Sequence, residues 1–139
     1  MLSILVVDDE VDFRDLLSTY LTDNTENDVV TAPNAREALE ILAVHRRQKR
    51  PIDFIISDVY MPGIDGRKFY EAVRTLDGYE HVPFLFVSGF DDNYAKESVV
   101  EPYIEGFMRK SETPLKLLSW IEYLSAPLRS RTHLVRPAE

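Results

Sequence analysis

The sequence predicts an open, doubly wound α/β domain with a single five-stranded parallel sheet and helices on both faces. Two observations predict it. Short apolar runs without alternation are typical of strands buried on both faces, and between these runs the apolar residues take on helical spacing. Because 139 residues with 45% hydrophobic content suffice for one core and are too few for two, we expect one domain.

The expected elements alternate along the chain. The strands are Ile4–Val7, a weaker Val29–Thr31, Phe54–Ile56, Phe84–Val87 and a short Phe107–Met108. The helices lie between and after them, at Phe13–Leu21, Ala35–Leu42, Phe69–Leu76, Asp92–Val100 and Leu117–Leu124. Each parallel pair of strands requires a crossover of this kind, so the alternation itself predicts the doubly wound sheet.

Three local signals set the limits of these helices. Asn34 followed by Glu37 resembles a capping box, and Thr113 followed by Pro114 predicts a cap with proline at the first helical position. Pro102 cannot continue a helix, so the fourth helix is short. We expect the domain to span residues 1–125 and a short polar, basic C-terminal tail to follow at residues 126–139.

Composition excludes several classes of function. Twenty-four acidic against sixteen basic side chains give a net charge of -8, which disfavours direct binding to nucleic acid or anionic membranes. The absence of cysteine excludes thiol catalysis, cysteine-ligated zinc and iron–sulfur clusters, and it favours a reducing compartment. The chain has neither a signal-peptide pattern nor an 18-residue apolar window, so we expect a cytoplasmic protein.

The candidate site lies at one edge of the predicted sheet. Ligands of open α/β sheets bind beyond the carboxyl ends of the strands, so the residues that follow each apolar run are the ones of interest. They are Asp8, Asp9, Ser57, Asp58, Ser88, Gly89 and Lys110. We therefore expect three carboxylates, a hydroxyl and an ammonium group to converge on one edge.

This set of side chains suits phosphoryl chemistry with a divalent metal. Carboxylates held close together repel unless a cation offsets them, and Mg²⁺ prefers a site with one or two carboxylates and several further oxygens. Lys110 and Ser88 have groups that hold phosphoryl oxygens. An aspartate beside Mg²⁺ and lysine is a competent nucleophile toward phosphorus. A simpler interpretation, that surface acids cap helices, fits Asp9 or Glu10 but leaves Asp58 at the end of an apolar strand unexplained.

Over roughly residues 2–125 the chain resembles the receiver domain of response regulators in two-component signalling, of the chemotaxis-regulator type with a flavodoxin-like fold. Four motifs, in order and at the ends of the expected strands, carry the resemblance. They are Ile4-Leu5-Val6-Val7-Asp8-Asp9-Glu10, Asp58-Val59-Tyr60-Met61-Pro62-Gly63 with Gly66, Val87-Ser88-Gly89, and Phe107-Met108-Arg109-Lys110.

The resemblance implies a role for each site residue. Asp58 is the expected phosphoacceptor, and Mg²⁺ is expected to bind Asp8, Asp9, Asp58 and the backbone carbonyl of Tyr60. Ser88 and Lys110 are expected to hold the phosphoryl group. Ser88 and Phe107 are expected to act as the switch that carries the change at the site to a surface around the fourth helix, the fifth strand and the fifth helix.

The resemblance also implies partners. The phosphoryl donor is expected to be a phosphohistidine on a histidine kinase or a histidine phosphotransfer protein. The signal is expected to leave through altered contacts with a downstream protein, and a homodimer is a further candidate assembly. Such a domain is not a conventional enzyme, because it catalyses only its own phosphorylation and dephosphorylation.

Three features depart from the usual pattern. Ser111 follows Lys110 where receivers usually have proline after a cis bond, and a cis bond before a non-proline residue costs ~3 kcal/mol, which leaves cis and trans both open. Phe107 stands in place of the commoner tyrosine. Pro102 shortens the fourth helix, and the apolar side chains around it predict an interaction surface. These are Tyr94, Val99, Tyr103 and Ile104.

Two alternative functions remain. The first is a receiver-like module that docks to partners without phosphorylation, and the complete set of site residues argues against it. The second is a Mg²⁺-dependent phosphatase that turns over an aspartyl phosphate, as in enzymes of the haloacid dehalogenase type. Those enzymes need a second aspartate two residues after the nucleophile, and Tyr60 occupies that position here.

Overall fold

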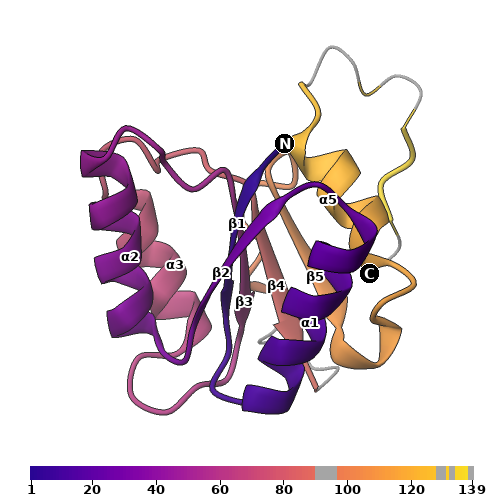
Figure 1. Cartoon of the computed structure of the whole chain (residues 1–139), viewed down its shortest axis with the longest axis horizontal. Helices are drawn as coiled ribbons and strands as arrows, with labels where there is room; N and C mark the ends of the chain where they lie inside the picture. Colours follow the sequence, from indigo (N-terminus) through magenta and orange to yellow (C-terminus); the bar gives the residue numbers. More distant parts are fainter. Residues whose placement is uncertain (90–96, 128–130, 132–133, 138–139) are drawn as a thin grey trace.

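Strands and helices alternate in the computed structural model, which describes residues 1–89, 97–127, 131 and 134–137 (Figure 1). The strands are β1 (Ser3–Val7), β2 (Asp28–Ala32), β3 (Phe54–Asp58), β4 (Phe84–Ser88) and β5 (Glu105–Arg109). The helices are α1 (Val11–Asn24), α2 (Ala35–Arg47), α3 (Gly66–Arg74), the 3₁₀ helix η1 (Lys110–Glu112) and α5 (Leu117–Ser125).

All neighbouring strands pair in parallel, in the order β2-β1-β3-β4-β5. Helices α2 and α3 cover one face of the sheet, and α1 and α5 cover the other (Figure 1). The predicted doubly wound five-stranded fold is therefore confirmed. Each strand is one or more residues longer than its apolar run, so Asp58 and Ser88 are the last residues of β3 and β4.

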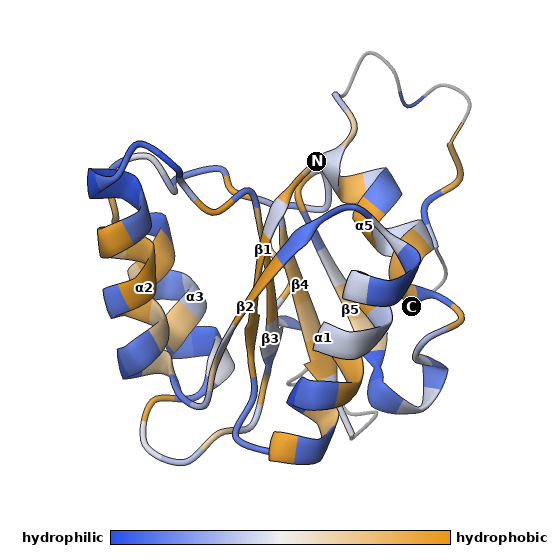
Figure 2. Ribbon diagram, in the orientation of Figure 1, coloured by the Kyte–Doolittle hydropathy of each residue, from blue (hydrophilic) through white to orange (hydrophobic). Residues whose placement is uncertain are grey.

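A separate apolar cluster fills each of the two layers. The first lies between the sheet and the α2–α3 face and includes Phe69, Phe84 and Phe107. The second lies between the sheet and the α1–α5 face and includes Leu17 and Trp120. Figure 2 shows the central strands as the most hydrophobic part of the ribbon, as expected for strands buried on both faces.

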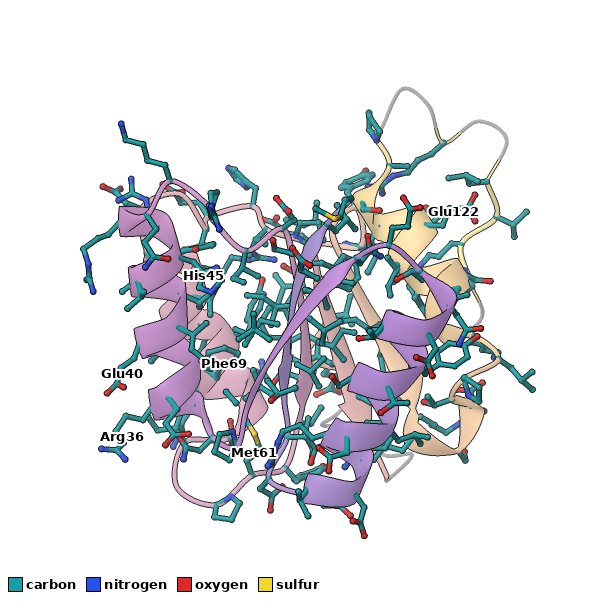
Figure 3. The ribbon with its side chains drawn as sticks, in the orientation of Figure 1. Arg36, Glu40, His45, Met61, Phe69 and Glu122 are labelled. Atoms are coloured by element: carbon teal, nitrogen blue, oxygen red, sulfur yellow. The ribbon has the colours of Figure 1, made fainter. Side chains whose placement is uncertain are left out.

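Side-chain direction in α2 and α3 follows the amphipathic pattern. In Figure 3, Phe69 points from α3 toward the sheet, while Arg36 and Glu40 point from α2 into solvent. Phe69 is fully buried, and Arg36 and Glu40 are exposed. The predicted cap of α2 is present, because the Asn34 side chain accepts a hydrogen bond of 2.9 Å from the backbone N–H of Glu37.

The predicted cap at Thr113 is wrong. Helix α5 begins at Leu117, and Thr113 ends the 3₁₀ helix η1, where its N–H donates to the Lys110 carbonyl. The chain makes one further turn, with Lys116 N–H bonded to the Glu112 carbonyl, before regular helix starts. The local hydrogen bonds after Lys110 therefore delay the helix.

The backbone bears on three other expectations. The expected fourth helix at 92–100 falls mainly on residues outside the described ranges, so it stays a prediction. The Lys110–Ser111 bond is trans, because Thr113–Pro114 is the only cis peptide in the described part of the chain. None of the described helices has the length and apolar character needed to cross a bilayer.

Candidate functional site

The carboxyl ends of β1, β3 and β5 bring Asp8, Asp58 and Lys110 together, as the strand order predicted. Lys110 Nζ lies 2.8 Å from Asp8 Oδ2 and 3.3 Å from Asp58 Oδ2. It also lies 2.5 Å from Glu10 Oε1 and 4.6 Å from the centroid of the Phe13 ring in α1. One ammonium group thus contacts three carboxylates at this edge of the sheet.

Strand register places the two buried acids. β1 and β3 are neighbours with Val7 opposite Ser57, so the residues that follow, Asp8 and Asp58, leave the sheet side by side. The backbone N–H of Asp8 donates to the Ala32 carbonyl. The backbone N–H of Val59, the residue after Asp58, donates to the Val87 carbonyl. The backbone ladder thus fixes both carboxylates at the sheet edge.

Gly66 fixes the start of α3 against the same edge. Its N–H donates to the Val59 carbonyl at 2.8 Å. A Cβ atom at Gly66 would lie 2.0 Å from the backbone oxygen of Asp58, which no side chain can tolerate. Glycine at this position therefore allows α3 to begin directly against the strand end that bears Asp58.

Burial changes the protonation behaviour of the three groups. Asp58 is only 6% exposed, and burial together with the nearby Asp8 charge raises its pKa to about 6 despite Lys110. Burial also raises the pKa of Asp8. Burial opposes the charge on Lys110, but hydrogen bonds to Asp8 and Glu10 together raise its pKa above the usual range. Lys110 therefore stays charged and offsets the repulsion between the acids.

The acid cluster suits a hard divalent cation. Carboxylate oxygens of Asp8, Glu10 and Asp58 all lie within 4.8 Å of one another. Asp8 Oδ2 is buried, and among the described residues it is paired with the Lys110 ammonium at 2.8 Å and has no further hydrogen-bond donor. A buried carboxylate oxygen with spare acceptor capacity, next to two further carboxylates, is the donor set that Mg²⁺ prefers.

The acid that joins this cluster is Glu10, whereas the resemblance implied Asp9. Asp9 is exposed and lies outside the group. Glu10 is the N-cap residue of α1, but its side chain makes no capping bond and contacts Lys110 instead. Sequence reasoning offered a helix cap only as the simpler interpretation of Asp9 or Glu10. Its contact with Lys110 needs the position of η1, which spacing alone does not give.

The other predicted site residues lie at or near the same edge. Tyr60 N–H donates to Asp58 Oδ1 at 3.4 Å, so the residue whose carbonyl was expected to bind metal is adjacent to Asp58. Ser88 is fully buried at the end of β4. Phe107 is fully buried in the core layer below α2 and α3. The expected switch roles of Ser88 and Phe107 stay predictions.

A third buried acid lies away from this site and was missed by sequence reasoning. Glu105 in β5 is fully buried and accepts from Arg74 at 2.9 Å and from the Tyr70 hydroxyl at 2.5 Å. Its other oxygen accepts from the N–H groups of Val100 and Glu101 at 2.8 and 2.7 Å. This network ties α3 to the segment that enters β5.

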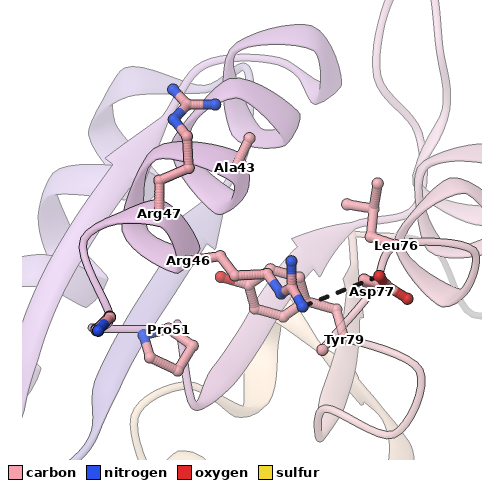
Figure 4. Close-up of a pocket in the computed structure, with 9 residues that line it drawn as sticks. Ala43, Arg46, Arg47, Pro51, Leu76, Asp77 and Tyr79 are labelled. Carbon is pink, nitrogen blue, oxygen red and sulfur yellow. Dashed lines mark ion pairs between the residues drawn. The ribbon is translucent and has the colours of Figure 1, made fainter.

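A hollow of about 650 Å³ lies at the opposite edge of the sheet, between the end of α2 and the turn before β4 (Figure 4). Arg46, Arg47, Lys49 and Tyr79 are among its lining residues. Its one ion pair, Arg46 with Asp77 at 4.0 Å, joins two exposed side chains and contributes little. The carboxylate cluster, with its buried acids and perturbed pKa values, is the better candidate for chemistry.

Comparison with known proteins assigns the chain to a family. The family model of the response regulator receiver domain matches residues 4–122, so the chain belongs to that family. Its role is accordingly that of a phosphoacceptor domain in signal transduction. This agrees with the resemblance seen in the sequence.

Individual relatives and solved structures are similar to most of this chain. An uncharacterized 14.6 kDa protein of Leptolyngbya boryana is 33% identical over 122 residues, which are 87% of this chain and 88% of that protein. The chemotaxis protein CheY4 of Vibrio cholerae has a TM-score of 0.75 at 32% identity, with 89% of this chain and 98% of that chain covered. The receiver domain of the histidine kinase CKI1 from Arabidopsis thaliana, solved with Mg²⁺, has a TM-score of 0.69 at 25% identity, with 87% and 90% covered. Other relatives are longer, and the chain spans about half of their length.

Proposed function

We propose that the protein accepts a phosphoryl group on Asp58 from a phosphohistidine donor, in a reaction that depends on Mg²⁺. The observation that carries the proposal is the contact of Lys110 Nζ with both Asp8 and Asp58. Asp58 is the buried last residue of β3. A carboxylate in this position is shielded from bulk water on most sides and faces a fixed cation.

Each side chain has a role in the proposed transfer. An oxygen of Asp58 attacks phosphorus, the bond from phosphorus to the donor histidine nitrogen breaks, and the electron pair returns to the imidazole. Lys110 holds the phosphoryl oxygens through its charge, and Ser88 holds them through its hydroxyl. The Lys110 ammonium is already in contact with Asp58, so the site needs no large rearrangement to stabilise the negative charge that develops on these oxygens.

Mg²⁺, when bound, offsets the charge between the carboxylates and the phosphoryl oxygens. Asp8 and Asp58 would hold it, with Asp9 as the third acid and the Tyr60 backbone carbonyl as a further ligand. The cluster of buried Asp8 and Asp58 carboxylates and the crystal structure of a 25% identical receiver domain with Mg²⁺ support this part of the proposal. Glu10 remains paired with Lys110 and is the alternative third acid.

The output is a change in protein contacts rather than turnover of a substrate. The added charge at Asp58 draws Ser88 toward it, and Phe107 follows, so that the surface around β5 and α5 changes. The partners proposed are a histidine kinase or histidine phosphotransfer protein on the input side and a downstream protein on the output side. The only reactions catalysed are the domain's own phosphorylation and dephosphorylation.

The test is phosphate uptake measured by intact mass. Incubation of the whole chain with a small phosphodonor and Mg²⁺ should add about 80 Da, the mass of one phosphoryl group. Asp58→Asn should remove the added mass, whereas the matched control Asp77→Asn, at an exposed surface acid, should keep it. A chelator present during the incubation should prevent the wild type from gaining this mass. Uptake by Asp58→Asn would overturn the assignment of the phosphoacceptor, and no uptake by the wild type would favour the docking module.

A further inference from the structure

Two arginines of the C-terminal segment fold back onto the domain. The described residues of this segment are 126–127, 131 and 134–137, and the side chains of Arg131 and Arg136 contact α5 and β5. Arg136 donates to the carbonyls of Pro102 at 2.6 Å and of Glu105 at 3.1 Å. Arg131 donates to the carbonyls of Leu124 and Ala126 at 3.0 Å each, and also to the carbonyl of Tyr103.

The same guanidinium groups lie over aromatic rings. Arg136 Cζ is 4.9 Å from the centroid of Trp120 and 5.9 Å from that of Tyr123. Arg131 Cζ is 4.9 Å from the centroid of Tyr123. We call the surface formed by Pro102, Tyr103, Glu105, Trp120 and Tyr123 the β5–α5 face. It offers backbone carbonyls beside aromatic rings, and a planar guanidinium can stack on a ring while donating to several carbonyls in its plane, which the tetrahedral donors of an ammonium group match less well.

The fold explains why these carbonyls are available. β5 is an edge strand of the sheet, so the outward carbonyl of Glu105 has no strand partner. The carbonyls of Leu124 and Ala126 lie at the end of α5, where the last helical carbonyls have no partner within the helix. Gly106 brings Trp120 close to β5, since a Cβ at Gly106 would lie 2.3 Å from the indole ring.

We propose that the β5–α5 face is a guanidinium-binding surface whose occupant is the chain's own C-terminal segment, held by Arg131 and Arg136. A protein that docks on this face must displace the segment, and an arginine-bearing segment of a partner would fit the same positions. This interaction does not depend on phosphate at Asp58, so it stands or falls separately from the proposed function.

Trp120 provides the measurement, because it is the single tryptophan of the chain and is fully buried with Arg136 over its ring. Acrylamide quenching of its fluorescence should increase about twofold or more in Arg131→Ala, Arg136→Ala, because the double variant removes the guanidinium groups that cover the aromatic surface. Arg36→Ala, Arg47→Ala removes the same two charges from exposed positions of α2 and should leave quenching unchanged.

Two further arms make the test specific. Arg131→Lys, Arg136→Lys keeps the charge but lacks the planar fork, so its quenching should lie close to that of the alanine double variant. A synthetic peptide of residues 127–139, added to the alanine double variant, should restore protection of Trp120, and the same peptide with both arginines replaced by alanine should not. Circular dichroism establishes that each variant is folded. Equal quenching in the wild type and both folded double variants would overturn the proposal, as would full protection in the lysine variant.

Discussion

Lys110 Nζ lies 2.8 Å from Asp8 Oδ2, although β1 and β5 are separated in the sheet by β3 and β4. Neighbouring strands are about 4.8 Å apart, so a lysine that followed β5 straight outward would not reach β1. Lys110 is the first residue of the 3₁₀ helix η1, which follows β5 directly. The contact therefore depends on the course of the chain after β5 as well as on the order of the strands.

Removing the ammonium should leave two buried carboxylates uncompensated. We expect Lys110→Met to lower the free energy of unfolding at pH 7 by about 3 kcal/mol, since breaking a buried ion pair exposes the remaining charge to an unfavourable environment. Lys116→Met, which removes a more exposed lysine paired with Glu112, should cost less than about 1 kcal/mol. Urea unfolding without divalent metal measures both. Equal losses would mean that Lys110 has no special role in stability.

Asp58 should make stability depend on pH below neutrality. Its pKa is about 6 in the folded protein against an ordinary value of 3.8, so the folded state binds the proton more tightly. The stability that the protonated carboxyl contributes is complete below about pH 3.8 and is lost as pH rises through about 6.

Asp58→Asn lacks this titration. The wild type loses this stability as the pH rises, and the variant does not. The free energy of unfolding of Asp58→Asn, minus that of the wild type, should therefore increase by up to about 3 kcal/mol between pH 4 and pH 7, which corresponds to the shift of about two units in the pKa of Asp58. Urea unfolding at pH 4, 5, 6 and 7 without metal measures the difference. A difference that stays constant over this range would contradict the raised pKa.

Mg²⁺ should stabilise the folded chain, because a ligand that binds only the folded state raises the free energy of unfolding. Asp8→Asn and Asp58→Asn should each abolish the rise in melting temperature that millimolar Mg²⁺ produces. We expect Asp9→Asn to reduce it more than Glu10→Gln, since Lys110 already neutralises Glu10. A larger effect of Glu10→Gln would assign Glu10 as the third ligand.

The Glu105 network should be worth far more than any surface ion pair. Glu105→Ala leaves Arg74, itself mostly buried, without its partner and frees the N–H groups of Val100 and Glu101. We expect a loss of about 3–5 kcal/mol in urea unfolding. Asp77→Asn breaks the exposed pair with Arg46 and should change stability by less than about 0.5 kcal/mol. Similar small effects of both would refute the structural role of Glu105.

The sheet could be predicted from sequence because strands buried on both faces are apolar throughout. The apolar run at Phe84–Val87 predicts β4, and the run at Phe54–Ile56 predicts the strand that ends at Asp58. The convergence of Asp8, Asp58 and Lys110 follows from the same logic, since parallel strands end at one edge.

Other features depended on contacts that have no local signal. Glu105 looks like a surface residue near Pro102, yet Tyr70 and Arg74 from a distant helix enclose it. The expected interaction surface stays a prediction, and its described residues differ in exposure. Tyr103 is 65% exposed, and its carbonyl binds Arg131, whereas Val99 and Ile104 are partly buried; Tyr94 lies outside the described residues. The polar tail gave no hint in the sequence that its arginines bind β5 and α5.

The order of the site residues along the chain has a consequence for folding. Lys110 is 100 residues from Glu10 and 52 from Asp58, so both acids leave the ribosome well before their cation. A nascent chain that pairs β1 with β3 brings Asp8 and Asp58 together while nothing neutralises them, and their repulsion opposes that early pairing. The arrival of β5 and η1 supplies the ammonium group that offsets it. We therefore expect the charge arrangement to weaken early closure of the sheet until nearly the whole domain has been synthesised.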